Sequence, residues 1–309
     1  MVRKEIARIL IPLVRPVYTG RIFFKIYWLA FNPPSHVSHT ILCFSMVFFC
    51  SNKIYGAFDS ESLSSFQNAA GVFPFSIYPN SLGALSDPTI LFINRSPFGA
   101  GSINRKFGLG SLMESLFVVG GNFRNLGLGL GLSRFGNSTY QETQISILGA
   151  KSYKELVHLG ISLNMYQLSI SHYGQAQAIG SKVGVRYAMG THVETMVSLL
   201  NVNRPVIGQS KEKLPQIISA GILVRPNDKI IGQASFVQDT EFPISVRFGM
   251  IYRLIDQIDI AVGKVQQPNI FTTGGCINWK EFRIEFSCLS YANLGFITYQ
   301  TGISYTHIP

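Results

Sequence analysis

His192 and Glu194 stand two residues apart, a spacing that places both side chains on one face of an extended strand. An imidazole beside a carboxylate is a starting point for a metal site or a hydrolytic site. The sequence supplies no third ligand and no nucleophile at a spacing typical of either chemistry. We therefore predict that the chain is not an enzyme, that it holds no metal or cofactor, and that the pair belongs to a polar inner surface.

The run LGLGLGL, residues 126–132, has the glycine content of a phosphate-binding loop. Such a loop requires a Lys-Ser or Lys-Thr pair after its last glycine, and none follows here. The strict alternation instead predicts a strand with leucines on one face and glycines on the other, where glycine makes room or permits curvature. We predict no nucleotide site.

A longer alternation, PISVRFGMIYRL at residues 243–254, indicates what such strands face. Its large apolar residues share one face for about ten positions, the length that a tilted strand needs to cross a bilayer. Ser245, Arg247, Gly249 and Arg253 share the other face, and only Ile251 breaks the pattern. On this phase, and on that of residues 281–287, we predict that the residues in contact with lipid include Val246, Phe248, Tyr252, Phe282, Ile284 and Phe286.

The opposite phase collects charged side chains, as Glu281, Arg283 and Glu285 do in EFRIEFS. An Arg side chain in contact with lipid at the bilayer midplane destabilises a membrane strand by about 2–4 kcal/mol. The charged face should therefore point away from lipid, into the interior of a membrane barrel. The predicted lumen-lining residues are Lys182, Arg186, His192, Glu194, Arg247, Arg253, Asp259, Glu281, Arg283 and Glu285. Two roles stay open for them: a filling of mutually paired charges, or a functional lining that selects solutes or docks the N-terminal segment.

Composition agrees with strands in lipid. The 309 residues are 47% hydrophobic and 14% charged, whereas a soluble domain has about 25% charged residues. No apolar run reaches the roughly 18 residues of a membrane-spanning helix, and turn-forming stretches separate the strands at hairpin distance. We predict an all-β fold: a closed antiparallel up-and-down transmembrane β-barrel of about 14 strands with a plug-like N-terminal segment. A periplasmic sandwich or a soluble barrel is the alternative.

Three regions differ in composition. Residues 1–57 contain the apolar run TILCFSMVFFC followed by small residues, which predicts a removable export leader, with a membrane anchor as the alternative. Residues 58–106 are rich in Gly, Pro, Ser and Asn, and we expect a plug or a periplasmic segment together with the first strand. Residues 107–309 are expected to form the barrel.

The leader carries most of the net charge and half of the cysteines. Without it the formal charge falls from +10 to +4, with 19 basic and 15 acidic side chains and no basic cluster, so no nucleic-acid partner is expected. Cys43 and Cys50 lie in the leader. We expect Cys276 and Cys288 to be free thiols because neighbouring strands present them on opposite faces.

The stretch SLGALSDPTILFINRSPFG, residues 81–99, resembles the N-terminal signature of the FadL-like outer-membrane barrels, in which an acidic residue precedes a short strand that ends in an Asn. Asp87 and Asn94 occupy these two positions. The hairpins of residues 221–307 follow the C-terminal order of the same family. Within that family the chain resembles the PorV/PorQ branch, which is associated with type-nine protein secretion.

The resemblance implies a barrel surrounded by lipid in the outer membrane of a Gram-negative bacterium. The first function that it implies is a component of a protein secretion system that binds the translocon or exported proteins. The alternative is a FadL-like channel for the uptake of hydrophobic small molecules, with a hydrophobic ligand as its partner. A structural barrel without either activity is the third possibility, and the sequence does not separate them because one barrel supports all three.

Overall fold

The computed structural model describes residues 57–58, 61–78, 82–93, 96–240, 242–292 and 294–307. The predicted leader, apart from Ala57, lies outside the described residues, and so do Cys43, Cys50 and Asn94. Gly56–Pro309 form one compact unit, to which the following description applies. No helix within the described ranges is long and apolar enough to cross a membrane.

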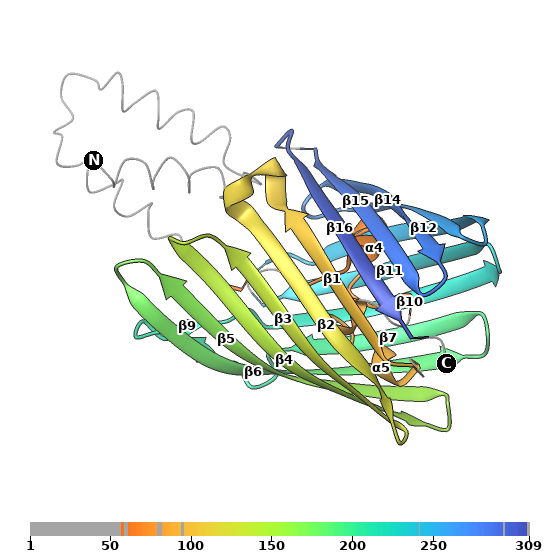
Figure 1. Ribbon diagram of the computed structural model, residues 1–309, viewed down its shortest axis with the longest axis horizontal. Coiled ribbons are helices and arrows are strands. Elements are labelled where there is room, and N and C mark those ends of the chain that lie inside the picture. Colours follow the sequence, from red (N-terminus) through yellow and green to blue (C-terminus); the bar gives the residue numbers. More distant parts are fainter. Residues whose placement is uncertain are drawn as a thin grey trace. The chain divides into compact units, whose positions relative to one another are not determined.

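The compact unit is a closed antiparallel β-barrel of 14 strands (Figure 1). Each strand pairs with its neighbour along the chain, β7 pairs with β10, and β1 closes the ring on β16. The strands are β1 (Phe98–Arg105), β2 (Met113–Phe123), β3 (Leu126–Gly136), β4 (Tyr140–Tyr153), β5 (Val157–Ile170), β6 (Gly174–Met189), β7 (Val193–Leu200), β10 (Ile217–Asn227), β11 (Ile230–Asp239), β12 (Ser245–Ile255), β13 (Ile258–Val265), β14 (Ile270–Trp279), β15 (Phe282–Tyr291) and β16 (Ile297–Thr306). The predicted closed antiparallel barrel of about 14 strands is confirmed.

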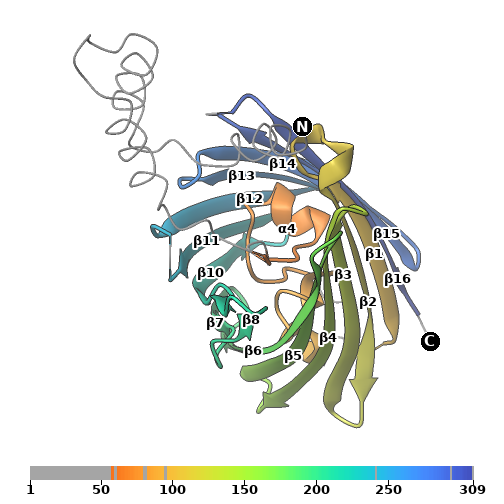
Figure 2. The same cartoon turned by 90° about the vertical axis from the view of Figure 1, so that its left-hand side faces the viewer.

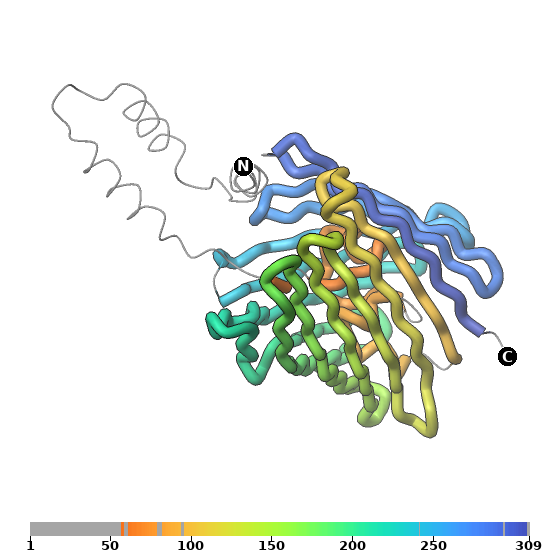
Figure 3. Tube along the Cα trace, turned by 60° about the vertical axis from the view of Figure 1, so that its left-hand side comes forward, coloured from red at the N-terminus to blue at the C-terminus, as the bar shows by residue number. Residues whose placement is uncertain are grey.

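The two ends of the barrel differ in their connections. One end, here the short-turn end, has tight turns between β2 and β3, β4 and β5, β6 and β7, β10 and β11, β12 and β13, and β14 and β15. The other, the long-loop end, includes residues 201–216, which carry the two-stranded sheet of β8 (Val206–Ile207) and β9 (Glu212–Lys213). The strands run obliquely around the ring (Figure 3), as expected for a barrel whose strands are tilted.

The inner segment, defined as residues 61–78 and 82–93, lies within the ring of strands. It contains α4 (Ser65–Ala69), the short helix η2 (Leu82–Ala84) and α5 (Ile90–Ile93). Figure 2 shows α4 surrounded by strands. The helix α4 contacts β13 to β16 whereas α5 contacts β2 to β5, so the segment reaches two groups of strands that lie on either side of β1. The assignment of residues 58–106 as a plug stays a prediction.

Local sequence explains the two helices. Ser64 and Gln67 form a capping box at the start of α4, in which each side chain accepts a hydrogen bond from the backbone N–H of the other residue. At α5 the resemblance predicts a short strand, but the structure has a helical turn. Asp87 is one physical reason, because its carboxylate accepts a hydrogen bond from the Thr89 backbone N–H at 3.2 Å and so caps the turn. Pro88 is the other, because proline is favoured at the first position of a helix.

Glycines on the inner faces of strands make room for the inner segment. A Cβ atom at Gly127, in the LGLGLGL strand, would lie 2.6 Å from the Leu91 carbonyl carbon. A Cβ atom at Gly263 of β13 would lie 2.3 Å from backbone atoms of Gly71. Real Cβ atoms do not approach this closely, so these glycines permit the backbone of the segment to lie directly on the wall.

Candidate functional site

Arg186 lies on the inner face of β6 and is only 1% exposed. Its guanidinium donates to Asp87 Oδ2 at 2.5 Å, to the Ser76 carbonyl oxygen at 2.6 Å and to Glu194 Oε2 of β7 at 2.5 Å. Glu194 also accepts from Arg225 of β10 at 2.5 Å. Arg186 therefore joins two points of the inner segment, Ser76 and Asp87, to the wall. Glu194, which also binds Arg225, fixes the orientation of the Arg186 guanidinium.

Two further basic side chains bind the inner segment. Lys182 of β6 lies with its Nζ 3.1 Å from Glu61 Oε1, and both side chains are buried. Arg247 of β12 donates to the Val72 carbonyl oxygen at 2.7 Å. Together with Arg186, these contacts bind the inner segment to β6 and to β12, which β7, β10 and β11 separate in the ring.

A second cluster forms around Arg283 of β15. Its guanidinium carbon lies 3.6 Å from the centre of the Tyr78 ring and 5.2 Å from that of Phe66, which is cation–π geometry. The Arg283 Nε lies 3.1 Å from Glu285 Oε1, and the other oxygen of Glu285 accepts from the Phe66 backbone N–H at 3.1 Å. Arg283 also donates to Cys276 Sγ at 2.9 Å. The cluster thus binds α4 through the backbone N–H and the ring of Phe66, and it binds the end of residues 61–78 through the ring of Tyr78.

Tyr78 extends this cluster to β13. Its hydroxyl donates to Asp259 Oδ2 at 2.8 Å, and Arg253 of β12 donates to Asp259 Oδ1 at 3.2 Å. Burial raises the pKa of Tyr78 above its ordinary value, Arg283 opposes this rise, and the charge of Asp259 adds to it. The hydroxyl therefore keeps its proton and stays a donor to the carboxylate.

Most of the predicted lumen-lining residues lie on inner faces of strands. They are Lys182, Arg186, Glu194, Arg247, Arg253, Asp259, Arg283 and Glu285. His192 and Glu281 do not, because β6 ends at Met189 and β15 begins only at Phe282. His192 is exposed in the turn before β7, with Nδ1 2.8 Å from the Arg225 carbonyl oxygen. The alternation that paired it with Glu194 does not extend through that turn, so the two side chains form no common inner pair.

The predicted lipid-facing residues lie on the outer phase of their strands. Phe248, Phe282, Ile284 and Phe286 are exposed, whereas Val246 and Tyr252 are partly covered by their neighbours. Cys276 is on the inner face of β14 and Cys288 on the outer phase of β15, and both are free thiols.

Ile251, which breaks the alternation of its strand, is 1% exposed and faces inward. It belongs to a buried apolar cluster with Phe73 and Phe75 of the inner segment and with Met196 and Leu223 of the wall. An apolar residue on the polar phase was therefore a sequence signal for an apolar region inside the barrel. Ser76, Tyr78 and Phe66 carried no such signal, because they lie outside any alternating strand.

The long-loop end carries another apolar cluster. Residues 201–216 bring Ile207 against Phe58 and Tyr166. Asn201 has a positive φ of 55° and accepts a hydrogen bond from the Tyr166 hydroxyl at 3.0 Å, which fixes the start of the loop. The chain therefore places buried apolar side chains at the end of the barrel opposite to its short turns.

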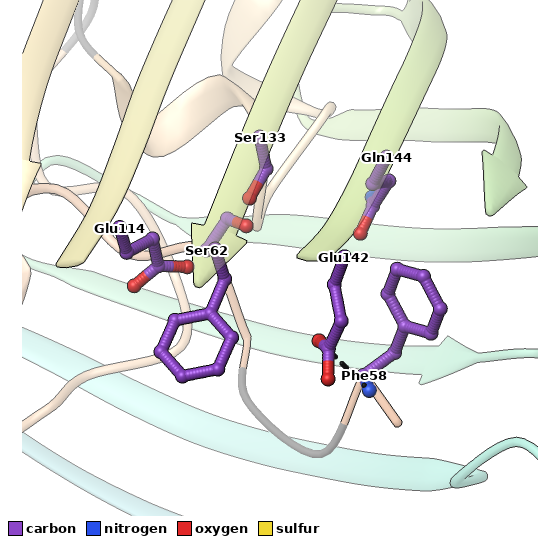
Figure 4. Close-up of a pocket in the computed structure, with 7 residues that line it drawn as sticks. Phe58, Ser62, Glu114, Ser133, Glu142 and Gln144 are labelled. Atoms are coloured by element: carbon purple, nitrogen blue, oxygen red, sulfur yellow. Dashed lines mark hydrogen bonds between the residues drawn. The ribbon is translucent and has the colours of Figure 1, made fainter. Parts of the chain in front are cut away.

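A small pocket adjoins Phe58 (Figure 4). Glu114, Ser133 and Glu142 line it, and the Phe58 backbone N–H donates to Glu142 Oε2 at 3.0 Å. Its cavity volume is about 10 Å³, room for one water molecule at most. In the part of the chain that the structure describes, no group of three His, Cys, Asp or Glu side chains is arranged to hold a metal ion.

No protein-family model and no curated protein matches the sequence. Among solved structures, the toluene transporter TodX of Pseudomonas putida is similar with a TM-score of 0.60 and 11% identity, covering 81% of this chain and 98% of that chain. The monoaromatic hydrocarbon channel CymD gives a TM-score of 0.61 and 12% identity, with coverage of 81% and 98%. A FadL homologue of Pseudomonas aeruginosa gives a TM-score of 0.54 and 9% identity, with coverage of 79% and 98%.

At such low identity the likeness is one of fold. The chain is a closed 14-stranded β-barrel with the fold of FadL-type outer-membrane transporters. The FadL-like fold expected from the N-terminal and C-terminal resemblance is thereby confirmed. The narrower PorV/PorQ assignment stays a prediction.

Proposed function

We propose that this protein is an outer-membrane channel that admits hydrophobic small molecules. The observation that carries the proposal is the apolar part of the lumen. Met196, Leu223 and Ile251 face inward and pack against Phe73 and Phe75 of the inner segment. The interior of a water-filled porin is polar, so an apolar inner wall fits an apolar solute better than a hydrated one.

A second apolar patch lies on the opposite part of the wall. Leu116, Val118 and Leu148 of β2 and β4 pack against Leu85 and Leu91 of the inner segment. If the segment shifts, both patches become accessible to a solute that makes the same apolar contacts. The inner segment thus acts as a plug whose own side chains occupy the solute's place.

The barrel ends give the proposed route a direction. Outer-membrane barrels have short periplasmic turns and longer extracellular loops, so the long-loop end is the outer one. A solute entering there first meets the apolar cluster of Phe58, Tyr166 and Ile207. The adjoining pocket of about 10 Å³ does not fit a hydrocarbon, so passage requires the inner segment to move.

The similar structures favour transport over secretion. TodX is a toluene transporter and CymD a monoaromatic hydrocarbon channel. A role in a secretion system, with a translocon or exported proteins as partners, rests on the family resemblance alone. Our proposal includes a location in the outer membrane of a Gram-negative bacterium, which the likeness of the barrel to outer-membrane transporters supports. That the channel has no enzymatic activity stays a prediction from the sequence.

The test is toluene binding by the purified protein, measured by calorimetry in detergent, with uptake of labelled toluene into cells that lack a channel of their own. Leu223→Asn places an amide on the apolar inner wall at nearly constant size and should weaken toluene binding by about 10-fold. Leu223→Ala is the matched control, because it removes volume but keeps the wall apolar. Equal toluene affinity for Leu223→Asn and the unaltered protein would contradict the proposal.

A further inference from the structure

Three turns at the short-turn end repeat one dipeptide, an aromatic residue followed by a basic one. The pairs are Phe123–Arg124, Tyr153–Lys154 and Trp279–Lys280, in the turns that follow β2, β4 and β14. Each aromatic side chain ends its strand on the outer phase and is highly exposed, at 63%, 63% and 66% respectively. Each basic residue is exposed as well.

The cation of each pair stands over the preceding ring. The Arg124 guanidinium lies 5.3 Å from the centre of the Phe123 ring, and the Lys154 ammonium lies 5.4 Å from that of Tyr153. The Lys280 ammonium lies 5.8 Å from the centre of the Trp279 ring. The charges are therefore held at the level of the outward-facing rings.

The backbone of these turns would favour other residues than Arg and Lys. Arg124, Lys154 and Lys280 have φ values of 50°, 53° and 53°. In hairpin turns such positive φ values favour Gly, Asn and Asp. A long basic side chain in this conformation at three turns indicates a role for the side chain, because the turn itself does not require it.

Aromatic residues at the end of a membrane strand lie at the level of the lipid headgroups. At that level a phospholipid offers its headgroup phosphate to an ammonium or guanidinium, and both cations bind phosphate well. We propose that these three turns bind the phosphate groups of phospholipid headgroups in the leaflet that the short-turn end reaches. The inference depends on the barrel lying in a membrane, and it is independent of which solute the lumen admits.

The experiment is a titration of the full-length protein, purified in nonionic detergent, with phosphatidylglycerol, read by native mass spectrometry. Diacylglycerol with the same acyl chains is the probe without phosphate. The triple variant Arg124→Asn, Lys154→Asn and Lys280→Asn keeps turns that favour positive φ and should still fold. We expect about five-fold weaker phosphatidylglycerol binding for each turn altered, since a basic residue near a lipid surface contributes about that factor. Diacylglycerol binding should not change.

A matched control removes basic residues from the other end. Arg204, Lys211 and Lys213 are exposed in the loop of residues 201–216, and the first two also have positive φ, at 49° and 52°. The triple variant of these residues to Asn should bind phosphatidylglycerol as the unaltered protein does. Undiminished phospholipid binding by the turn variant, or an equal loss in the control, would overturn the proposal. Toluene binding measured on the same samples separates this outcome from failure of the channel proposal.

Discussion

Arg186 shows how a single side chain ties the inner segment to the wall. Its guanidinium contacts the Ser76 carbonyl, Asp87 and Glu194. The residue is 1% exposed and is therefore shielded from solvent. A buried ion pair contributes modestly when it is intact, but removing one partner leaves an uncompensated charge. Loss of the Arg186 side chain should therefore destabilise the inner segment and the wall together.

We predict that Arg186→Gln lowers the free energy of unfolding by about 3–5 kcal/mol, because Asp87 keeps a buried charge without its cation. Urea unfolding in detergent micelles measures the change. Arg134→Gln is the control, since Arg134 donates to Gln141 at an exposed site and its loss should change the free energy by about 1 kcal/mol or less. The double variant Arg186→Met, Asp87→Leu should regain part of the stability; a double variant as unstable as Arg186→Gln would contradict the ion-pair explanation.

At the scale of the strand, successive side chains of β12 point alternately to the lipid-facing and the lumen-facing side of the barrel wall. Phe248 is 53% exposed on the outer phase, while the neighbouring Arg247 binds the Val72 carbonyl inside. We predict that Phe248→Arg blocks insertion, because a cation on the lipid face costs about 2–4 kcal/mol. Arg247→Leu should still insert. Heat-modifiable migration on gels reports the folded barrel, and equal behaviour of the two variants would show the faces to be wrong.

The inner segment rests on β13 through a contact between two backbones. A Cβ atom at Gly263 would meet Gly71 at 2.3 Å, and backbone atoms cannot give way as a side-chain end can. We predict that Gly263→Val leaves the barrel folded but displaces the segment, which limited proteolysis within residues 61–93 detects. Gly232→Val is the control, because nothing lies within 4 Å of a Cβ atom there. Equal protease resistance of the two variants would contradict the close fit.

The strands could be predicted from the sequence because each carries its own period-two signal, as β15 does with Phe282, Ile284 and Phe286 outward. The closed ring followed from the hairpin spacing together with the number of strands, because an antiparallel sheet of that size in a membrane closes and leaves no edge. The site could not be predicted to the same depth, because its contacts join residues far apart in the chain, such as Asp87 and Arg186. Turn boundaries were the other failure: His192 lies where alternation has already stopped.

At the scale of the whole molecule, the inner segment and the barrel share one interior. Two apolar clusters bind the segment to opposite parts of the wall, and the buried charges of Arg186 and Arg283 hold it between them. Apolar side chains alone would be sufficient to fill the lumen of the barrel. Buried ion pairs give position more than stability, so we expect these contacts to fix where the segment lies in the lumen.

The last prediction tests whether release is needed for transport. A Cβ atom at Gly302 of β16 would lie 3.1 Å from Ser65 Oγ in α4, a separation that suits a disulfide between the two positions. We predict that the variant Ser65→Cys, Gly302→Cys forms this bond on oxidation and then fails to take up toluene, while reduction with dithiothreitol restores uptake. Ser65→Cys alone is the control for the new thiol and should transport in both redox states. Mass measurement verifies the cross-link in the oxidised double variant. If this cross-linked protein carries toluene at the normal rate, the segment does not have to leave the wall at α4. The path of toluene must then run between the barrel and the part of the segment beyond residue 71.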